Sequence, residues 1–406
     1  MISSGDALKS LAIEAALSPQ EEMLEIGRKK QSLFIGIPKE TEFQEQRVAL
    51  VPESVGFLVS NGHRVLIESG AGEKANFSDN DYSESGAEIS YDTQEVYRAD
   101  IILKVTPPSV QEIEMMKYKQ ILFSALQLTV QPKDALKKLI EKKITAIAWD
   151  YIEDEDGSFP IIRSMGEIAG TTAVLIAAEL MSSSNNGKGL MLGNVAGITP
   201  PEMVIIGAGT VGQFAASAAL ALGVSVKVFD NSIYRLRRLQ RDIGNRVFTS
   251  VIQPKVLAKA LRRCDVAIGA LRVPHGRTPC VVSEEMVKTM KSGSVIVDVS
   301  IDKGGCFETS RITTHEKPTF KSFDVIHYCV PNIASSVSRT ASYGLSNIFS
   351  PLLIEISDRG GCDKLIQTEK GFRHGVYIYK GTLTSSFLGE TFNLPYKDLD
   401  LLISAL

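Results

Sequence analysis

Cysteine and histidine are scarce in this chain of 406 residues, and neither forms a recognisable ligand pattern. Its five cysteines lie far apart with no CxxC pair, and its five histidines give no HxxxH or HExxH pattern. An odd number of cysteines cannot all pair within one chain. We therefore expect free thiols in a reducing compartment, and no disulfide framework or metal site.

An excess of charge of one sign is also lacking. Charged residues make up 22% of the chain, and the formal net charge is -3 at pH 7. Nucleic acids and anionic membranes attract basic surfaces, so the expected partners are small molecules, with no nucleic acid and no membrane. The N-terminus has no cationic start before an apolar core, unlike a secretory signal. We expect a cytoplasmic protein.

One uncharged stretch, Met203 to Val226, is long enough to span a bilayer. However, three glycines in its first half and Gln213 are more typical of a strand, a glycine turn and a buried helix. The same stretch contains the strongest chemical motif of the chain, which is described below.

In the first part of the chain, short apolar runs alternate with helical segments. The expected strands are 33–40, 63–70, 100–108, 120–126 and 144–150, and the expected helices lie around 52–61, 79–86, 93–98 and 132–142. This rhythm predicts an α/β domain with a largely parallel sheet. Ahead of it, residues 1–30 are expected to form a helical extension, with a capping box that begins at Ser18.

A second α/β run follows a long helix, expected over residues 166–181, and a glycine-rich loop. Its strands are expected in the segments MVIIGAG, VSVKVFD, CDVAIGAL and GSVIVDVS. From about Ala334 the pattern becomes helical again. The later segment VYIYKGTLT predicts a hairpin with Lys380 and Gly381 at its turn.

These patterns predict an α/β protein of two domains with a cleft between them. Residues 165–334 are expected to form a Rossmann-type dinucleotide-binding domain. Residues 31–164 together with 335–406 are expected to form a second, Rossmann-like substrate domain, because we infer that the tail returns to the first part of the chain.

The dinucleotide-binding prediction depends on a GxGxxG pattern between an apolar strand and an alanine-rich helix, Gly207-Ala208-Gly209-Thr210-Val211-Gly212. The first glycine permits a tight turn, the second lets a pyrophosphate approach the backbone, and the third lets helix and strand pack closely. The helix N-terminus then presents N–H donors to the phosphates. Taken alone, the pattern could be an ordinary glycine turn, but the surrounding strand and helix favour cofactor binding.

The cofactor is expected to be NAD. Asp230 stands at the end of the next strand, where its carboxylate would accept hydrogen bonds from the adenosine ribose hydroxyls. Arg235, Arg237 and Arg238 follow and could accommodate a 2′-phosphate, which would indicate NADP. A solvated helix face is the simpler interpretation of these arginines, because Asp230 would repel that phosphate. Arg235 is kept as a candidate cofactor contact.

Several longer segments resemble one enzyme family. The opening IGIPKETEFQEQRVALVPESVGFLVSNGHRVLIESGAG resembles alanine dehydrogenases and the related NAD-binding subunit of proton-translocating transhydrogenase. The segments AIGALRVPHGRTPCVVSEEMVKTMKSGSVIVDVSIDKGGCFETSR, HYCVPNIASSVSRTASYGLSNI and GVYIYKGTLTSSFLGETFNL are similar to alanine dehydrogenases more narrowly. The resemblance runs from about residue 33 to the end of the chain.

The resemblance implies a set of site residues. Arg47 matches the arginine that binds the substrate carboxylate, a role that suits its fixed fork of donors. Lys104 matches the lysine beside the reacting carbon, and Asp302 and Asn332 match residues beside the nicotinamide. Leu271, within the matched segment, is a further candidate cofactor contact. Without the resemblance, Arg47 and Lys104 would be interpreted as surface charges and Asp302 as a turn or capping residue.

One position departs from the family pattern. Alanine dehydrogenases usually carry a histidine that exchanges protons with the reacting centre in the segment matched by LFSALQLT, where this chain has Gln127. An amide can donate and accept hydrogen bonds but cannot take a proton at neutral pH. Two interpretations follow. Either Gln127 occupies the catalytic position while Lys104 or Asp302 carries out the proton transfers, or the substrate is a different one.

The expected function is reversible oxidation of L-alanine by NAD⁺ to pyruvate and ammonium. The alternatives are a transhydrogenase-like NAD-binding subunit, a saccharopine- or opine-type dehydrogenase acting on another oxo acid, and a non-catalytic NAD-binding protein. The resemblance also implies a homo-oligomer, most commonly a hexamer, and a role in amino-acid catabolism.

Overall fold

The computed structural model describes residues 30–42, 44–126, 133–244, 247–273 and 276–404. The helical extension expected over residues 1–30, with its cap at Ser18, lies almost wholly outside the described residues, and so does Gln127.

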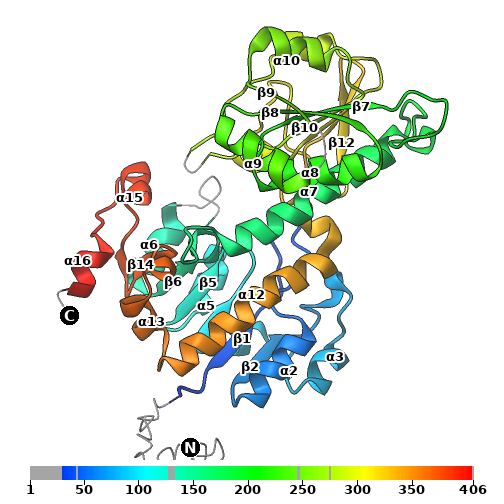
Figure 1. The fold of residues 1–406 in the computed structure, drawn as a ribbon. Helices are drawn as coiled ribbons and strands as arrows, with labels where there is room; N and C mark the ends of the chain where they lie inside the picture. The colour runs from blue at the N-terminus through cyan, green and yellow to red at the C-terminus, as the bar shows by residue number, and fades with distance from the viewer. Residues whose placement is uncertain (1–29, 43, 127–132, 245–246, 274–275, 405–406) are drawn as a thin grey trace, which may run out of the picture.

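The described chain forms two α/β lobes, each built on one sheet (Figure 1). The first sheet has eight strands in the order β15-β14-β6-β5-β4-β1-β2-β3. Strands β1 to β6 pair in parallel, and β14 runs antiparallel to β6. The bounds are β1 Phe34–Ile37, β2 Arg64–Glu68, β3 Glu88–Ser90, β4 Ile101–Leu103, β5 Ile121–Ser124, β6 Thr145–Ala148, β14 Val376–Tyr379 and β15 Thr382–Leu383.

The second sheet has seven strands in the order β12-β13-β11-β10-β7-β8-β9, all parallel except β12. Strands β10 and β11 are buried along their whole length, as expected for a parallel sheet that is covered by helices on both faces. The bounds are β7 Glu202–Ile206, β8 Ser225–Phe229, β9 Phe248–Ser250, β10 Val266–Gly269, β11 Val295–Asp298, β12 Thr319–Ser322 and β13 Val325–Tyr328.

The helices flank the sheets and join the two lobes. In Figure 1, α8 and α9 lie on one side of the second sheet and α10 on the other. The helices are α2 Pro52–Ser60, α3 Asp79–Glu84, α4 Thr93–Val96, α5 Val110–Met115, α6 Lys133–Glu141, α7 Pro160–Met181, α8 Thr210–Ala221, α9 Ile233–Ile243, α10 Pro254–Leu261, α11 Glu284–Lys288, α12 Ser338–Asp358, α13 Cys362–Thr368, α14 Lys370–Arg373, α15 Ser386–Phe392 and α16 Leu399–Ser404. Five 3-10 turns are η1 Glu73–Ala75, η2 Trp149–Tyr151, η3 Ser183–Asn185, η4 Val299–Lys303 and η5 Ile333–Val337.

Helix α7 runs from the first lobe into the second and packs against both α8 and α12 (Figure 1). A Cβ atom added at Gly170 would lie 2.3 Å from the Val211 carbonyl oxygen, so α7 and α8 approach each other too closely for a side chain there. Among the described residues, α7 alone is long and apolar enough to cross a membrane, but half of that window is buried inside the molecule, as in a core helix.

The predicted α/β fold of two Rossmann-like sheets is confirmed. Every predicted strand of the first lobe contains an observed strand, and the stretch Met203 to Val226 is a strand, a glycine turn and a buried helix. The predicted hairpin is also present: β14 pairs with β15, and Lys380 and Gly381 both have positive φ, as its tight turn requires.

Three secondary-structure elements differ from the prediction in their bounds or their presence. The strand expected over 100–108 ends at Leu103, because two prolines follow and α5 starts at a capping box on Ser109. Strand β3 was not predicted, since this short strand at the edge of the sheet has only one apolar residue. The long helix begins at Pro160 rather than 166, with proline in the first turn, where its missing N–H costs little.

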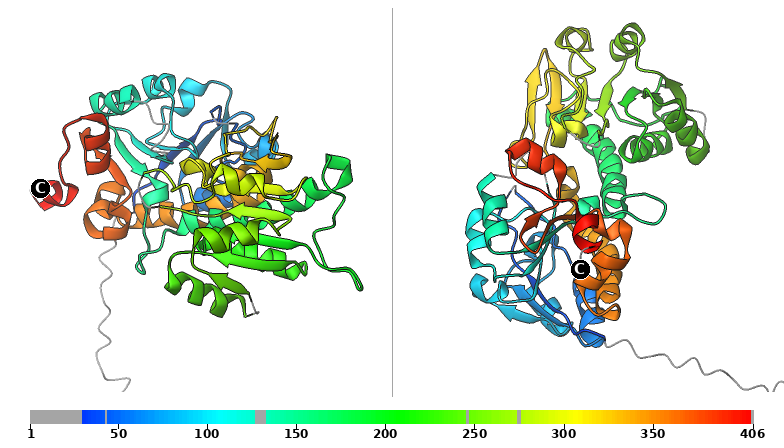
Figure 2. Two further views of the ribbon diagram at one scale, coloured as in Figure 1. Left: turned by 90° about the horizontal axis from the view of Figure 1, so that it is seen from above. Right: turned by 90° about the vertical axis from the view of Figure 1, so that its left-hand side faces the viewer.

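The C-terminal segments lie with the first lobe, as Figure 1 and the right-hand view of Figure 2 show. Strands β14 and β15 extend the first sheet beyond β6, and α12 packs against α2. The loops that follow β1, β4 and β6 therefore emerge along one edge of this sheet, since the three strands are parallel. This edge holds most of the candidate site.

Candidate active site

The loop after β1 contacts two segments near the second sheet, one that follows β13 and one that precedes β12. The Gln46 backbone N–H donates to Ser335 Oγ over 2.9 Å, and the His315 backbone N–H donates to the Gln44 side chain over 2.8 Å. The Asn332 amide donates to the Glu45 carboxylate. Two segments almost 300 residues apart in the sequence thus form one wall of the site.

Arg47, the predicted carboxylate-binding residue, is held by Glu45. Its Nε and Nη2 atoms donate to the two carboxylate oxygens over 2.8 and 2.7 Å. The two side chains are 5% and 0% exposed. Burial would raise the pKa of Glu45, but the Arg47 charge and hydrogen bonds from Arg47 and Ser335 lower it to about 2. The remaining nitrogen of Arg47, Nη1, donates to the Met165 sulfur over 3.3 Å, its one hydrogen bond within the part of the chain that the structure describes.

Lys104 follows β4 and has no exposed surface. Its Nζ atom lies 2.6 Å from Glu112 Oε1 and 3.2 Å from Glu40 Oε2. Burial favours the neutral amine, but these two carboxylates outweigh it and raise the pKa of Lys104. The Tyr97 hydroxyl also donates to Glu112 over 2.9 Å, and the Thr106 hydroxyl donates to Glu40. Lys104 is therefore a fixed cation at neutral pH.

Asp302 and Asn332 lie next to each other at the edge of the second lobe. The Asn332 backbone N–H donates to Asp302 Oδ1 over 2.8 Å. The backbone of Asn332 has a φ of 57°, a left-handed conformation that asparagine tolerates better than most residues. Desolvation by the surrounding protein raises the pKa of Asp302, although the Asn332 hydrogen bond and the Arg47 charge lower it.

The local structure at Asp302 corrects one expectation. The strand expected in the segment GSVIVDVS would end close to Asp302, but β11 already ends at Asp298, and Asp302 lies in η4. The reason is Asp298 itself, whose carboxylate accepts the Ser300 N–H over 3.1 Å and turns the chain.

The structure brings the four predicted substrate-site residues into one cluster. Glu45 connects Arg47 to Asn332, which in turn binds Asp302. Glu40 pairs with Lys104 and also interacts electrostatically with Arg47.

Three carboxylates of this cluster, Glu40, Glu45 and Glu112, were missed by sequence reasoning. One signal was available: a lysine at the end of a buried strand must be paired when it is buried itself, because an isolated buried charge is very costly. Glu112 also occupies the third position of the capping box at Ser109.

The glycine turn lies between β7 and α8, as predicted. Gly207 has a φ of 118°, and a Cβ atom there would lie 2.3 Å from the Ala270 carbonyl oxygen. At Gly212 a Cβ atom would lie 1.8 Å from the Gly207 carbonyl oxygen. At Gly209, in contrast, an added Cβ atom would meet no neighbouring atom of the described residues within 4 Å. Two glycines are therefore required by the fold, and the third leaves open space before the helix N-terminus, where a pyrophosphate fits.

Other predicted cofactor contacts surround this turn. Thr210 and Val211 form the first turn of α8, and the Leu271 backbone N–H lies directly beside Gly207. Asp230 follows β8 and is 4% exposed, with its two oxygens accepting the N–H groups of Ala208 and Ser232 over 2.8 and 2.7 Å.

Each carboxylate oxygen of Asp230 can accept a second hydrogen bond, so a ribose hydroxyl can still bind there. Arg235 is nearly half-exposed and lies 4.0 Å from Asp230. A negative group at this position fits a dinucleotide without a 2′-phosphate.

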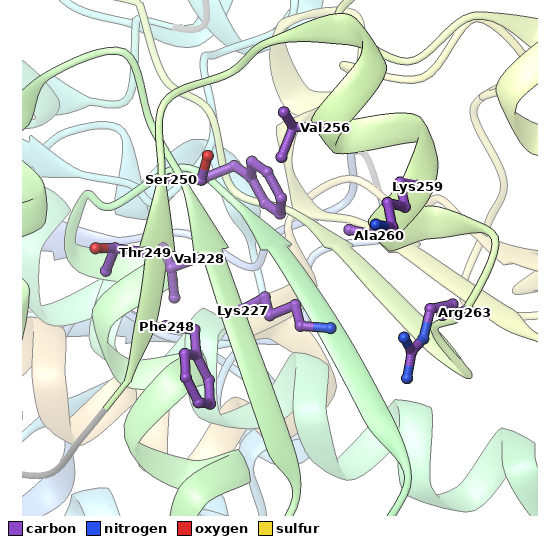
Figure 3. A pocket seen from close by; sticks show the side chains of 10 residues that line it. Lys227, Val228, Phe248, Thr249, Ser250, Val256, Lys259, Ala260 and Arg263 are labelled. Atoms are coloured by element: carbon purple, nitrogen blue, oxygen red, sulfur yellow. The ribbon is translucent and has the colours of Figure 1, made fainter.

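A separate pocket of about 200 Å³ lies between β8, β9 and α10 (Figure 3). Its cationic side chains are Lys227, Lys259 and Arg263. Lys227 and Arg263 are both ion-paired with Glu202, at 2.7 and 3.1 Å. None of the predicted cofactor or substrate residues lines this pocket, so it does not belong to the site described above.

Comparison with known proteins assigns both lobes to one family. The model of the alanine dehydrogenase/PNT N-terminal domain matches residues 36–169, and that of the C-terminal domain matches residues 173–386. The chain is 40% identical over 366 residues to an alanine dehydrogenase of Methanococcus maripaludis, covering 90% of this chain and 98% of that protein. It is 37% identical to an alanine dehydrogenase of Mycolicibacterium smegmatis, with the same two coverages.

Solved structures agree with these sequence matches. A structure described as L-alanine dehydrogenase superposes with a TM-score of 0.83 at 35% identity, covering 88% of this chain and 99% of that one. A transhydrogenase from Sinorhizobium meliloti superposes with a TM-score of 0.74 at 23% identity, covering 87% and 99%, and shows the shared fold alone.

Proposed function

The chain belongs to the alanine dehydrogenase/PNT family, and from this premise we propose that it is an NAD-dependent alanine dehydrogenase. It interconverts L-alanine and water with pyruvate and ammonium. The observation that carries this proposal is the cluster of Arg47, Lys104, Asp302 and Asn332 in a chain that matches alanine dehydrogenases over 90% of its length.

The glycine turn and Asp230 supply the NAD site. When bound, NAD⁺ accepts a hydride from the substrate α-carbon. Gly209 leaves room for the pyrophosphate at the N-terminus of α8, and Asp230 binds the adenosine ribose. Asp302 and Asn332, joined by their hydrogen bond, stand at the nicotinamide end of the site.

Arg47 binds the substrate carboxylate. Two of its nitrogens are occupied by Glu45, and the third faces the Met165 thioether, a weak acceptor that a carboxylate displaces. Lys104 supplies a positive charge beside the reacting carbon. Because Lys104 has no exposed surface here, its direct contact with substrate requires the side chains around it to rearrange.

The proposal also covers the division of the chain into domains and its assembly. Residues 31–164 with 335–406 form the substrate domain, and residues 165–334 form the NAD domain. The membership of β14 and β15 in the first sheet supports this division. We further propose a cytoplasmic homohexamer, as the resemblance to alanine dehydrogenases implies. Light scattering of the purified full-length protein measures the number of subunits.

The decisive experiment follows NADH absorbance with the purified chain in both directions. The oxidative assay contains L-alanine and NAD⁺, and the reductive assay contains pyruvate, ammonium and NADH. A Lys104→Ala variant that still binds NADH, and is therefore folded, controls for contaminating enzymes, and Lys137→Ala, an exposed lysine on α6, is the matched surface control.

Turnover by the wild-type and Lys137→Ala proteins, lost in Lys104→Ala, supports the proposal. No turnover in either direction by a protein that still binds NADH would contradict it. Other oxo acids would then be tested, since saccharopine- and opine-type dehydrogenases and transhydrogenase-like subunits share the need for an NAD site.

A further inference from the structure

The proposed reaction needs a group that takes up and returns a proton near neutral pH, and the most obvious residues do not fit. Lys104 is kept charged by two carboxylates, and Arg47 is always charged. The pKa of Glu45 is about 2, so it stays ionised. The sequence has glutamine at position 127, which cannot take a proton. The remaining candidates are carboxylates whose pKa is raised, Asp302 at the edge of the second lobe and Asp150 at the edge of the first.

Asp150 lies on the same edge of the first sheet as Lys104. It follows β6, in the sheet order β6-β5-β4-β1, whose parallel strands all end at this edge. The Leu126 N–H, which follows β5, donates to Asp150 Oδ1 over 3.0 Å. The neighbouring Trp149 indole donates to the Lys104 carbonyl oxygen over 3.2 Å. Asp150 and its neighbour Trp149 thus contact the segments that follow β5 and β4.

The second lobe presents positive charge to Asp150. Arg272, which follows β10, and Lys303, which adjoins Asp302 in η4, both interact electrostatically with its carboxylate. Arg272 also lies over the Phe159 ring of the first lobe, 5.9 Å from its centre. Asp150 therefore stands where the substrate edge of the first lobe meets the nicotinamide edge of the second.

The charge state of Asp150 is suited to proton exchange. Burial raises the pKa of Asp150 to about 6, while the Leu126 hydrogen bond, Arg272 and Lys303 oppose that rise. Tyr151, on the same 3-10 turn, keeps its proton because burial and the Asp150 charge raise its pKa to about 12. The two oxygens of this carboxylate can accept hydrogen bonds in addition to the one that the Leu126 N–H donates. A water molecule can therefore bind.

We propose that Asp150 holds the water molecule that adds to the substrate imine and is the proton-transfer residue of this chain. The inference rests on the proposed function and assigns to Asp150 the proton exchange that Gln127 cannot perform. It also replaces Lys104, which the structure keeps charged, as the candidate for this role.

A single carboxylate can carry out the proton transfers in the hydrolytic half of the reaction. Water adds to the positively charged imine: a C–O bond forms, the C=N electron pair moves to nitrogen, and one water proton passes to Asp150. Asp150 then returns this proton to the nitrogen. The C–N bond breaks with its electron pair on nitrogen, the hydroxyl becomes a carbonyl, and the hydroxyl proton goes to the departing ammonia, giving ammonium. Asp150 ends as a carboxylate.

The test compares Asp150→Asn with Glu155→Gln, a matched amide substitution at an exposed residue of the loop that follows. For Asp150→Asn we expect kcat for alanine oxidation to fall about 10²–10⁴-fold. A rapid burst of NADH should remain, because hydride transfer precedes water addition. The acid limb of the wild-type pH profile, with a midpoint near pH 6, should disappear. Glu155→Gln should match the wild type.

A purely structural role for Asp150 predicts a different pattern. A burst lost together with kcat, or a kcat within about threefold of wild type, would overturn the inference. Should Asp150→Asn fail to fold, Asp150→Glu decides: it keeps a carboxylate, so partial activity with a displaced acid limb supports the inference, and an undisplaced limb overturns it. Infrared spectra across this pH range add a readout without cofactor, since the protonated carboxyl band should be missing from Asp150→Asn.

The same assays separate this inference from the proposed function. A wild-type protein that does not oxidise alanine overturns both. A wild-type protein that does, together with a fully active Asp150→Asn variant, overturns only the role of Asp150.

Discussion

Glu45 binds Arg47 through two parallel hydrogen bonds, and neither side chain has more than 5% of its surface exposed. The same carboxylate accepts hydrogen bonds from Asn332 and Ser335, which belong to the segment after β13. The pair therefore does more than neutralise a buried arginine. It fixes the direction of the guanidinium and links it to Asn332, one of the residues that we propose to stand beside the nicotinamide.

The first prediction concerns Glu45→Gln. Removing one partner of a buried ion pair leaves the other charge unpaired, which typically costs about 3–5 kcal/mol of unfolding free energy. We expect a loss of this size in urea unfolding at neutral pH, together with a higher KM for pyruvate, because Arg47 loses its fixed orientation. Glu42→Gln, on the same loop, is the control and should behave as wild type. An unchanged stability would contradict the buried pair.

A second prediction uses the pH dependence of the same pair. The pKa of Glu45 is about 2 in the folded protein, below its ordinary value of 4.5. A lowered folded-state pKa contributes stability that is present above 4.5 and is lost as the pH falls towards 2. The difference in unfolding free energy between wild type and Glu45→Gln should therefore shrink over this range. A difference that stays constant from neutral pH to pH 2 would show that the carboxylate is not selectively stabilised by folding.

The third prediction separates charge balance from catalysis at Lys104. Lys104→Met leaves Glu40 and Glu112 buried without their cation, so we expect strong destabilisation. Adding Glu112→Gln removes one uncompensated charge and should recover part of the stability, as measured by thermal unfolding. Activity should not return in the double variant, because no positive charge stands beside the reacting carbon. Recovery of turnover would show that Lys104 is structural only.

Much of the fold could be predicted because its signals are local. An apolar run such as Ile101–Leu103 must be buried, and alternation with helices implies a parallel sheet. The glycine turn at Gly207 was identified because each glycine has its own steric reason. The short strand β3 was missed since its three residues carry almost no apolar pattern.

The environment of the site could not be predicted to the same extent. Lys104 alone looks like a surface charge, yet it has no exposed surface, because the sheet order brings Glu40 from β1 beside it. The contact between Glu45 and Asn332 spans 287 residues and depends on how the two lobes meet. The spacing of residues in the sequence predicts neither the order of the strands nor the contact between the lobes. The roles of Arg47, Lys104, Asp302 and Asn332 were therefore inferred from the family resemblance.

The final prediction compares two glycines of the same turn. Gly209 has an ordinary φ of −77° and open space around its missing Cβ, so Gly209→Ala should fold with an unchanged melting temperature. Its methyl group would stand where the pyrophosphate approaches, so the dissociation constant for NADH should rise. Gly212→Ala places a Cβ atom 1.8 Å from the Gly207 carbonyl oxygen, so this variant should lose stability instead.

Fluorescence titration with NADH and thermal unfolding of both variants measure the two effects separately. If Gly209→Ala bound NADH as tightly as wild type, the dinucleotide would not lie against this turn. The cofactor site would then have to be sought elsewhere, even though the family assignment would stand. If Gly209→Ala instead unfolded at a lower temperature, the open space at Gly209 would be the wrong description of the turn. Only weakened binding at unchanged stability fits a pyrophosphate in that space, because the added methyl group meets no protein atom within 4 Å.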